Sequence, residues 1–338
     1  MWTEAKLNEL LTTPSPALAN DMRRLPGDLM VLGAGGKMGP SLCVLAKRAF
    51  EAAGKNARVV AVSRFTGEGE RRWLEENGVE TIAADLLDLM QRAALPQIEN
   101  IVFMAGRKFG TCGREALTWA MNAALPAFVA EQFKASRIVV FSSGNVYPPV
   151  PVHTSGCTED TPPGPVGEYA MSCLARERAF EYAAEAHGTK VLLFRLNYAV
   201  DLRYGVLYDI AERILAGRPV PLAAPSCNVI WQGSANETAL RCLLHAASPA
   251  CKRNVTGPET LSVRDTALRL GELLGKEPVF DGPEGTHALR SDASLATELF
   301  GPPSVSAATL IEWQGQWVLD GGRGLGKPTH FEEREGSY

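Results

Sequence analysis

The chain has 338 residues, of which 46% are hydrophobic and 21% are charged, a balance that indicates a globular protein and excludes a disordered or fibrous one. The net charge is -4 and no basic run exceeds two residues, so neither nucleic acid nor an anionic membrane surface is expected as a partner. A small-molecule ligand is expected instead.

Membrane insertion and export are not expected either, because no window of 18 apolar residues occurs and the first residues lack a signal-peptide pattern. The seven cysteines are an odd number and include no C-x-x-C pair. This usage is typical of reduced thiols in the cytoplasm rather than of a disulfide framework. No metal site is expected, since no second ligand pair matches the spacing of His153 and Cys157.

The N-terminal part of the chain predicts a helical extension over residues 1–27, with a helical period at 3–11 followed by prolines. Beyond it, short apolar segments alternate with longer segments of helical composition. The predicted strands are 29–32, 58–62, 80–84, 100–104, 138–142 and 190–195, and the clearest helices between them are 40–53, 115–134 and 169–186.

These strands are continuously apolar, as expected when helices cover both faces of a parallel sheet. The pattern predicts an α/β fold with a doubly wound parallel sheet, the Rossmann type, over residues 28–200. After about residue 200 the alternation stops. We expect a smaller C-terminal substrate domain made of 201–228 and 251–319, with 229–250 returning to the first domain and 320–338 forming a packed or interface tail.

The segment VLGAGGKMG places Gly33, Gly36 and Gly39 between the first strand and the following helix. Such glycines permit a tight turn and a close approach of the backbone to a pyrophosphate, which the helix N-terminus then binds. The loop predicts a dinucleotide site that also includes Lys37 and Met38.

The end of the second strand carries Ser63 and Arg64 and no acid. An acid there binds the adenosine ribose of NAD, whereas an arginine accommodates the 2′-phosphate of NADP, so NADP is favoured and NAD is the alternative. The alternative is that Arg64 is a solvated surface charge. Asp85, followed by Leu86, is placed to accept a hydrogen bond from the adenine amino group, although an N-cap would explain it as well.

Together these segments resemble the extended short-chain dehydrogenase/reductase family, the NAD(P)-dependent epimerases and dehydratases that include UDP-galactose 4-epimerase. The resemblance runs from about Gly27 to about Trp317, and its most specific pieces are the glycine loop, FMAGRKFG, FSSGNVYPP and YAMSC. It implies that small residues and a lysine lie against the cofactor, that an asparagine lies behind the site, and that a serine and a tyrosine are catalytic. The tyrosine also lies at the cofactor. In this sequence these positions are Ala105, Gly106, Lys108, Asn122, Ser143 and Tyr169.

The family's active-site lysine, four residues after the tyrosine, is replaced here by Cys173. In the family this lysine holds the nicotinamide ribose and lowers the tyrosine pKa from about 10. A neutral thiol does neither, and we expect Cys173 to act as a small buried hydrophobe. Arg176 or Lys108 could supply the missing charge. Without it, oxidation of an alcohol should suffer more than reduction of a carbonyl, because only oxidation needs tyrosinate.

The substrate candidates are Asn145, Asn197 and Tyr198. The family often has asparagine three residues after the arginine of strand six, whereas here Asn197 follows Arg195 by two. In place of the family's V-D-D segment the chain has WQGSAN. These departures put a nucleotide-sugar substrate in doubt.

The sequence therefore favours an NAD(P)-dependent oxidoreductase or epimerase that acts on a sugar, sugar acid or nucleotide sugar. The alternative is an NAD(P)-binding protein with little or no turnover, acting as a sensor or through a partner. A homodimer is common in the resembled family, but no sequence feature proves one.

Overall fold

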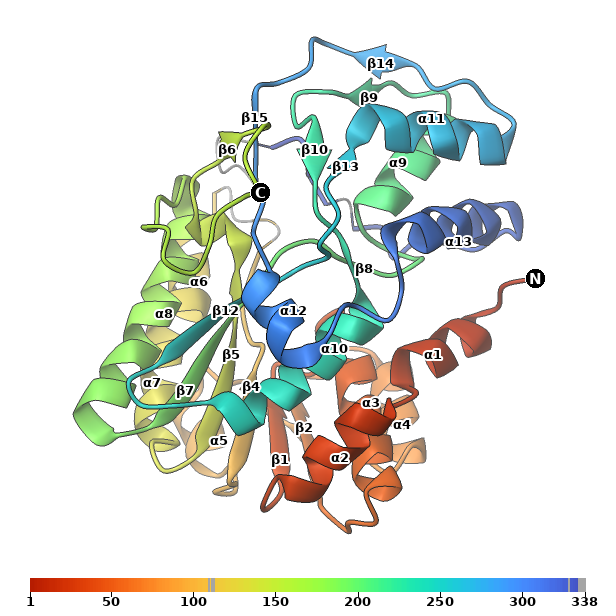
Figure 1. The fold of residues 1–338 in the computed structure, drawn as a ribbon. Helices are drawn as coiled ribbons and strands as arrows, with labels where there is room; N and C mark the ends of the chain where they lie inside the picture. Colours follow the sequence, from red (N-terminus) through yellow and green to blue (C-terminus); the bar gives the residue numbers. More distant parts are fainter. Residues whose placement is uncertain (109, 111–112, 328, 334–338) are drawn as a thin grey trace.

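A computed structural model describes residues 1–108, 110, 113–327 and 329–333. Its centre is a sheet of seven parallel strands in the order β12-β7-β5-β4-β1-β2-β3 (Figure 1). The strands are β1 (Leu29–Leu32), β2 (Val59–Ser63), β3 (Glu80–Ala83), β4 (Asn100–Phe103), β5 (Arg137–Ser143), β7 (Lys190–Leu196) and β12 (Cys251–Val255). The predicted doubly wound parallel fold is confirmed.

Side chains alternate between the two faces of this sheet, and on central strands such as β1 and β4 both faces are buried. On β1, Leu29 and Val31 belong to one apolar cluster, while Met30 and Leu32 belong to the other. The first cluster lies under α2 (Pro16–Arg24), α3 (Gly39–Ala52) and α10 (Gln232–Arg241), and the second under α7 (Leu125–Gln132) and α8 (Gly167–His187). Burial on both faces explains why the strands are apolar without alternation.

The N-terminal extension forms two helices, α1 (Glu4–Thr12) and α2, that pack against α3 and α10 (Figure 1). Ser15 caps α2 by accepting a hydrogen bond from the backbone of Leu18. Ahead of α1, Trp2 lies edge-on to Trp313 of the second domain, with 5.2 Å between ring centroids. The extension therefore contacts both domains.

The helix predicted over 115–134 is divided into α6 (Glu115–Trp119), a π-helical turn η1 (Ala120–Ala124) and α7. A π turn inserts one residue into the helical hydrogen-bond ladder and often marks a functional site. Here it carries the buried side chain of Asn122 toward the loop that follows β4.

The second domain packs α9 (Val206–Leu215), α11 (Val263–Leu274) and α13 (Ala307–Leu319) around its own apolar cluster. One predicted boundary differs from the structure, because residues 251–255 form β12, one of the two edge strands of the main sheet. The remaining elements are α4 (Glu68–Glu76), α5 (Leu89–Ala93), η2 (Gly144–Val146), β6 (Val150–Pro151), β8 (Ala199–Val200), β9 (Val220–Pro221), β10 (Ser226–Cys227), β11 (Ile230–Trp231), η3 (Cys242–His245), β13 (Leu261–Ser262), β14 (Phe280–Asp281), β15 (His287–Ala288) and α12 (Ser294–Phe300). No helix among the described residues is long and apolar enough to cross a membrane.

A buried ion pair joins α8 to the sheet. The guanidinium of Arg195 on β7 donates to both carboxylate oxygens of Glu177, at 2.7 and 2.9 Å, and both side chains are fully buried. Ser142 on β5 also donates to Glu177, at 2.5 Å. Arg195 further donates to the hydroxyl of Tyr147, which donates in turn to Asn254 on β12.

Removing one partner of the Glu177–Arg195 pair should therefore lower the stability of the fold. Arg195→Met leaves the Glu177 carboxylate buried without its cation, so we expect a loss of about 3–5 kcal/mol in the free energy of unfolding. Urea denaturation measures this loss. The matched control is Glu80→Gln, which breaks the solvent-exposed pair with Arg58 and should cost far less. Similar losses in the two variants would contradict the structural role of the buried pair.

Candidate active site

A cavity of about 560 Å³ opens at the carboxyl ends of the central strands, where doubly wound domains bind their ligands. Four segments contribute most of its walls: the glycine loop, the loop after β4, the end of β5 with the start of α8, and the chain after β7. The lining residues include Gly33, Gly36, Lys37, Met38, Gly106, Arg107, Lys108, Ser143, Asn145, Tyr169, Asn197, Tyr198 and Tyr204.

The glycine loop has no room for side chains at its tightest points. Gly33 has φ +90°, and a Cβ on it would lie 2.5 Å from the backbone nitrogen of Ala105. A Cβ on Gly39 would lie 2.2 Å from the carbonyl oxygen of Ala34. Larger residues would therefore push the loop away from the neighbouring backbone, and the open side of the loop faces the cavity.

Lys37 extends from this loop across the cavity. Its amine donates to the carbonyl oxygen of Ala199 at 2.8 Å and lies 3.9 Å from the ring centroid of Tyr204. Burial lowers the pKa of Lys37 to about 7, although the charge of Asp201 opposes the shift. The cavity therefore contains an amine that changes charge near neutral pH.

The two predicted catalytic side chains meet at the wall of the cavity. Ser143 ends β5, Tyr169 lies in the first turn of α8, and their hydroxyls are hydrogen-bonded. The thiol of Cys173, one turn further along α8, is fully buried and also contacts the Tyr169 hydroxyl. Burial raises the pKa of Tyr169 well above its usual value of 10, so the phenol is neutral at physiological pH.

Two cations lie near this tyrosine. Arg176 is buried on α8, where it donates to the carbonyl oxygen of Phe141 at 2.7 Å and to Oδ1 of Asn122 at 2.9 Å. Its charge opposes the rise in the pKa of Tyr169. The amine of Lys108 lies 5.9 Å from the Tyr169 ring centroid, and burial lowers its pKa to about 8. Both candidates for a relocated charge are thus close to the site.

Asn122 lies behind the cavity instead of lining it. Its amide pairs with both backbone groups of Arg107 and donates to Ser172 Oγ on α8, in addition to accepting from Arg176. All of these bonds tie the loop after β4 to α8. Asn122 therefore orients the wall that carries Gly106 and Lys108.

The predicted adenosine residues lie outside this cavity lining. Ser63 ends β2 with its hydroxyl beside Gly35, and Arg64 is exposed. Asp85 accepts from the backbone of Leu87 in a local turn, and Leu86 is buried in the core. Neither Asp85 nor Leu86 projects into the cavity, so their predicted contacts with the adenine stay predictions.

The sequence did not identify the C-terminal tail as part of the site. Lys327 and Thr329 line the cavity, and Thr329 is fixed by hydrogen bonds from its backbone and hydroxyl to the buried carboxylate of Asp209 on α9. Pro328 and residues 334–338 of the predicted tail lie outside the described residues. The Gly-rich, charged composition of the tail gave no sign of these contacts.

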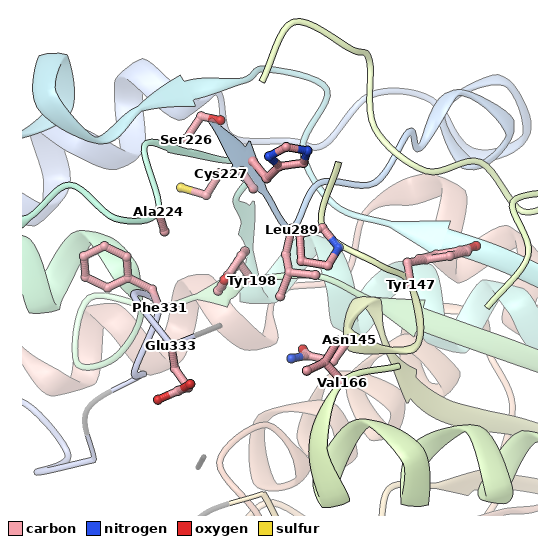
Figure 2. A pocket seen from close by; sticks show the side chains of 13 residues that line it. Asn145, Tyr147, Val166, Tyr198, Ala224, Ser226, Cys227, Leu289, Phe331 and Glu333 are labelled. Carbon is pink, nitrogen blue, oxygen red and sulfur yellow. The ribbon is translucent and has the colours of Figure 1, made fainter. Parts of the chain in front are cut away.

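A second, smaller pocket adjoins the cavity on the side of the second domain. Figure 2 shows Asn145, Tyr198, Cys227 and Phe331 among the side chains around it. Its wall is mostly apolar, and the lining residues that the structure describes include Glu333 but no lysine or arginine. Asn145 and Tyr198 line both spaces, so the smaller pocket is continuous with the predicted substrate residues of the cavity wall.

Comparison with protein families identifies the chain. The model described as the NAD dependent epimerase/dehydratase family matches residues 29–246, which is more than half of the sequence. The chain belongs to this family. The match includes the glycine loop, Ser143, Tyr169 and the chain after β7. No curated protein matches the sequence.

Solved structures with the same fold align with this chain over nearly their full length. UDP-glucuronic acid 4-epimerase from Bacillus cereus, in complex with NAD, has a TM-score of 0.70 at 19% identity and covers 86% of this chain and 96% of its own. Thermus thermophilus UDP-glucose 4-epimerase with NAD has a TM-score of 0.69 at 21% identity, with 86% and 98% covered. dTDP-glucose 4,6-dehydratase from Bacillus anthracis with NAD has a TM-score of 0.71 at 14% identity, with 87% and 97% covered.

The lowered pKa of Lys37 makes a prediction about stability. The unfolded chain keeps the lysine proton up to about pH 10.5, whereas folded Lys37 releases it near pH 7. Between these values the unfolded state binds more protons, so the free energy of unfolding rises with pH. We expect Lys37→Met to make this rise shallower, by at most about 1.4 kcal/mol per pH unit.

Urea denaturation at several values between pH 7 and pH 10 measures the slope. Lys134→Met, at an exposed lysine, is the control and should keep the wild-type slope. If the slope of Lys37→Met equals that of wild type, the pKa of the Lys37 amine in the folded protein is not lowered.

Proposed function

We propose that the protein is an NAD(P)-dependent oxidoreductase or epimerase acting on a sugar or a related polyol, with Tyr169 and Ser143 at the reacting oxygen. The observation that carries this proposal is the hydrogen bond between these two hydroxyls at a cavity bounded by a glycine loop. NAD(P) fits the residues present, because the loop leaves its backbone open and Lys37 and Lys108 offer positive charge.

The bound cofactor would supply or accept a hydride at the substrate carbon. During reduction, the neutral phenol of Tyr169 donates its proton to the carbonyl oxygen, and Ser143 donates a hydrogen bond to the same oxygen. In the reverse direction Tyr169 must first lose its proton. Burial disfavours that step, so we expect reduction to be the better reaction.

The smaller pocket supports an uncharged, hydroxylated substrate more than a nucleoside diphosphate. Phosphate groups are usually bound by arginine, lysine or helix N-termini. Among the described lining residues of this pocket there is neither arginine nor lysine. Asn145, Tyr198 and Ser226 offer neutral hydrogen-bonding groups that suit sugar hydroxyls.

Cofactor choice depends on the adenosine end of the site. Arg64 would favour NADP, as the sequence predicts, while the neighbours of the same fold were solved with NAD.

A second candidate function is cofactor binding without turnover, favoured by the buried thiol at the position of the family's lysine. Turnover that appears only in Cys173→Lys would support this candidate. The test screens sugar ketones, lactones and UDP-glucose with NADH and NADPH.

Tyr169→Phe also distinguishes an active enzyme from a protein that binds the cofactor without turnover. The substitution removes only the phenolic hydroxyl, so we expect turnover to fall by about 100-fold or more while cofactor affinity stays near the wild-type value. Fluorescence titration with NADH and steady-state rates measure the two quantities. Met171→Leu, at an exposed position on the same helix, is the control. Equal turnover in Tyr169→Phe and wild type would exclude Tyr169 as the proton donor.

Arg176 should act on Tyr169 through its charge. Arg176→Met removes the cation that opposes the rise in the Tyr169 pKa, so we expect oxidation to fall by about tenfold and its pH profile to move upward. Reduction should fall less. Arg176→Lys should restore part of the oxidation rate.

The control is Arg178→Met, an exposed arginine two residues further along α8. An equal fall in both directions with no shift of the pH profile would assign Arg176 a purely structural role. Asn122 and Phe141, its hydrogen-bond partners, would then explain the loss.

A further inference from the structure

The carboxylate of Glu70 lies against the glycine loop. Glu70 is in the first turn of α4, which follows the end of β2. A Cβ built on Gly35 would lie 3.0 Å from Oε1 of Glu70 and 2.3 Å from Oγ of Ser63. In doubly wound domains the adenosine ribose binds between the glycine loop and the end of the second strand. Glu70 and Ser63 therefore flank the ribose position.

This carboxylate has no hydrogen bond or ion pair within the part of the chain that the structure describes. Glu70 is half-buried, and burial raises its pKa, with only the charge of Lys327 acting in the opposite direction. A partly desolvated carboxylate without donors is unfavourable. A ligand that brings two hydroxyl donors to this place would satisfy it.

The two cofactors differ in what they bring. The ribose of NAD offers its 2′ and 3′ hydroxyls as donors, whereas the 2′-phosphate of NADP offers only acceptors and additional negative charge. Next to a carboxylate, the hydroxyls are attracted and the phosphate is repelled.

We propose that Glu70 is the ribose-binding acid of this protein and that it makes NAD the preferred cofactor. This inference rests on the proposed function, since it assumes that the cavity binds NAD(P). The sequence favoured NADP instead, because the end of the second strand, where the acid of NAD-binding proteins usually lies, carries Ser63 and Arg64. The chain turns at Phe65, which has φ +44°, and the following helix α4 places the carboxylate of Glu70 beside the glycine loop.

The test is a direct binding measurement on the full-length protein. NAD and NADP are titrated separately by calorimetry into wild type, Glu70→Gln and Glu76→Gln. Glu76 is an exposed acid on the same helix and serves as the control. Thermal unfolding of each variant without ligand checks that the fold is retained.

We expect wild type to bind NAD at least about tenfold more tightly than NADP, as the loss of a hydrogen bond to a charged group implies. In Glu70→Gln the affinity for NAD should fall by about tenfold and the affinity for NADP should rise, so that the preference is lost. Glu76→Gln should have the affinities of wild type.

Two results would overturn the proposals, and they are distinguishable. If wild type binds NADP as tightly as NAD and Glu70→Gln has the same ratio, the role of Glu70 is wrong while NAD(P) binding stands. If neither nucleotide binds to wild type, the proposed function itself fails.

Discussion

The buried pair of Glu177 and Arg195 is the constraint on which the site depends. Ionised groups are rarely buried unless each one is paired. Here Glu177 also accepts a hydrogen bond from Ser142, and Arg195 donates one to the hydroxyl of Tyr147. Ser142 precedes Ser143, and Glu177 lies two helical turns after Tyr169 on α8. The pair therefore fixes the end of β5 relative to α8, which determines how the serine and tyrosine hydroxyls meet.

The chemistry of the tyrosine follows from what surrounds it once it is held there. A lysine beside Tyr169 would lower its pKa, but the chain has a buried thiol at that position. Positive charge enters instead from Arg176 on the same helix and from Lys108 after β4. Arg176 is itself tied to Asn122 and to the carbonyl of Phe141, so this charge cannot move freely toward the tyrosine hydroxyl. A proton donor is more compatible with this arrangement than a base.

The features that depend on local sequence were predictable. Six of the seven strands of the main sheet and the glycine loop were found because apolar runs and glycine spacing are visible in the sequence itself. The features that depend on tertiary contacts were not. Strand β12 is an edge strand and contains polar residues such as Lys252 and Arg253, so no apolar run indicated its pairing with β7. Thr329 of the tail enters the cavity because of one buried acid on α9, which no local signal indicates.

If NAD(P) binds in the cavity as proposed, the site differs from the family pattern in a consistent way at both ends. Near the nicotinamide end the expected lysine is absent, yet Arg176, three residues later on the helix, brings a guanidinium close to the same tyrosine. Near the adenosine end the expected acid is absent, yet Glu70 lies beside the glycine loop. In both cases the expected position holds a small neutral side chain, Cys173 or Ser63, and the charge comes from the next element or turn. A motif describes where a charge usually lies in the sequence, whereas the chemistry depends only on where the charge lies in space. For this reason, the loss of a motif residue here argues for a rearranged site before it argues for an inactive one.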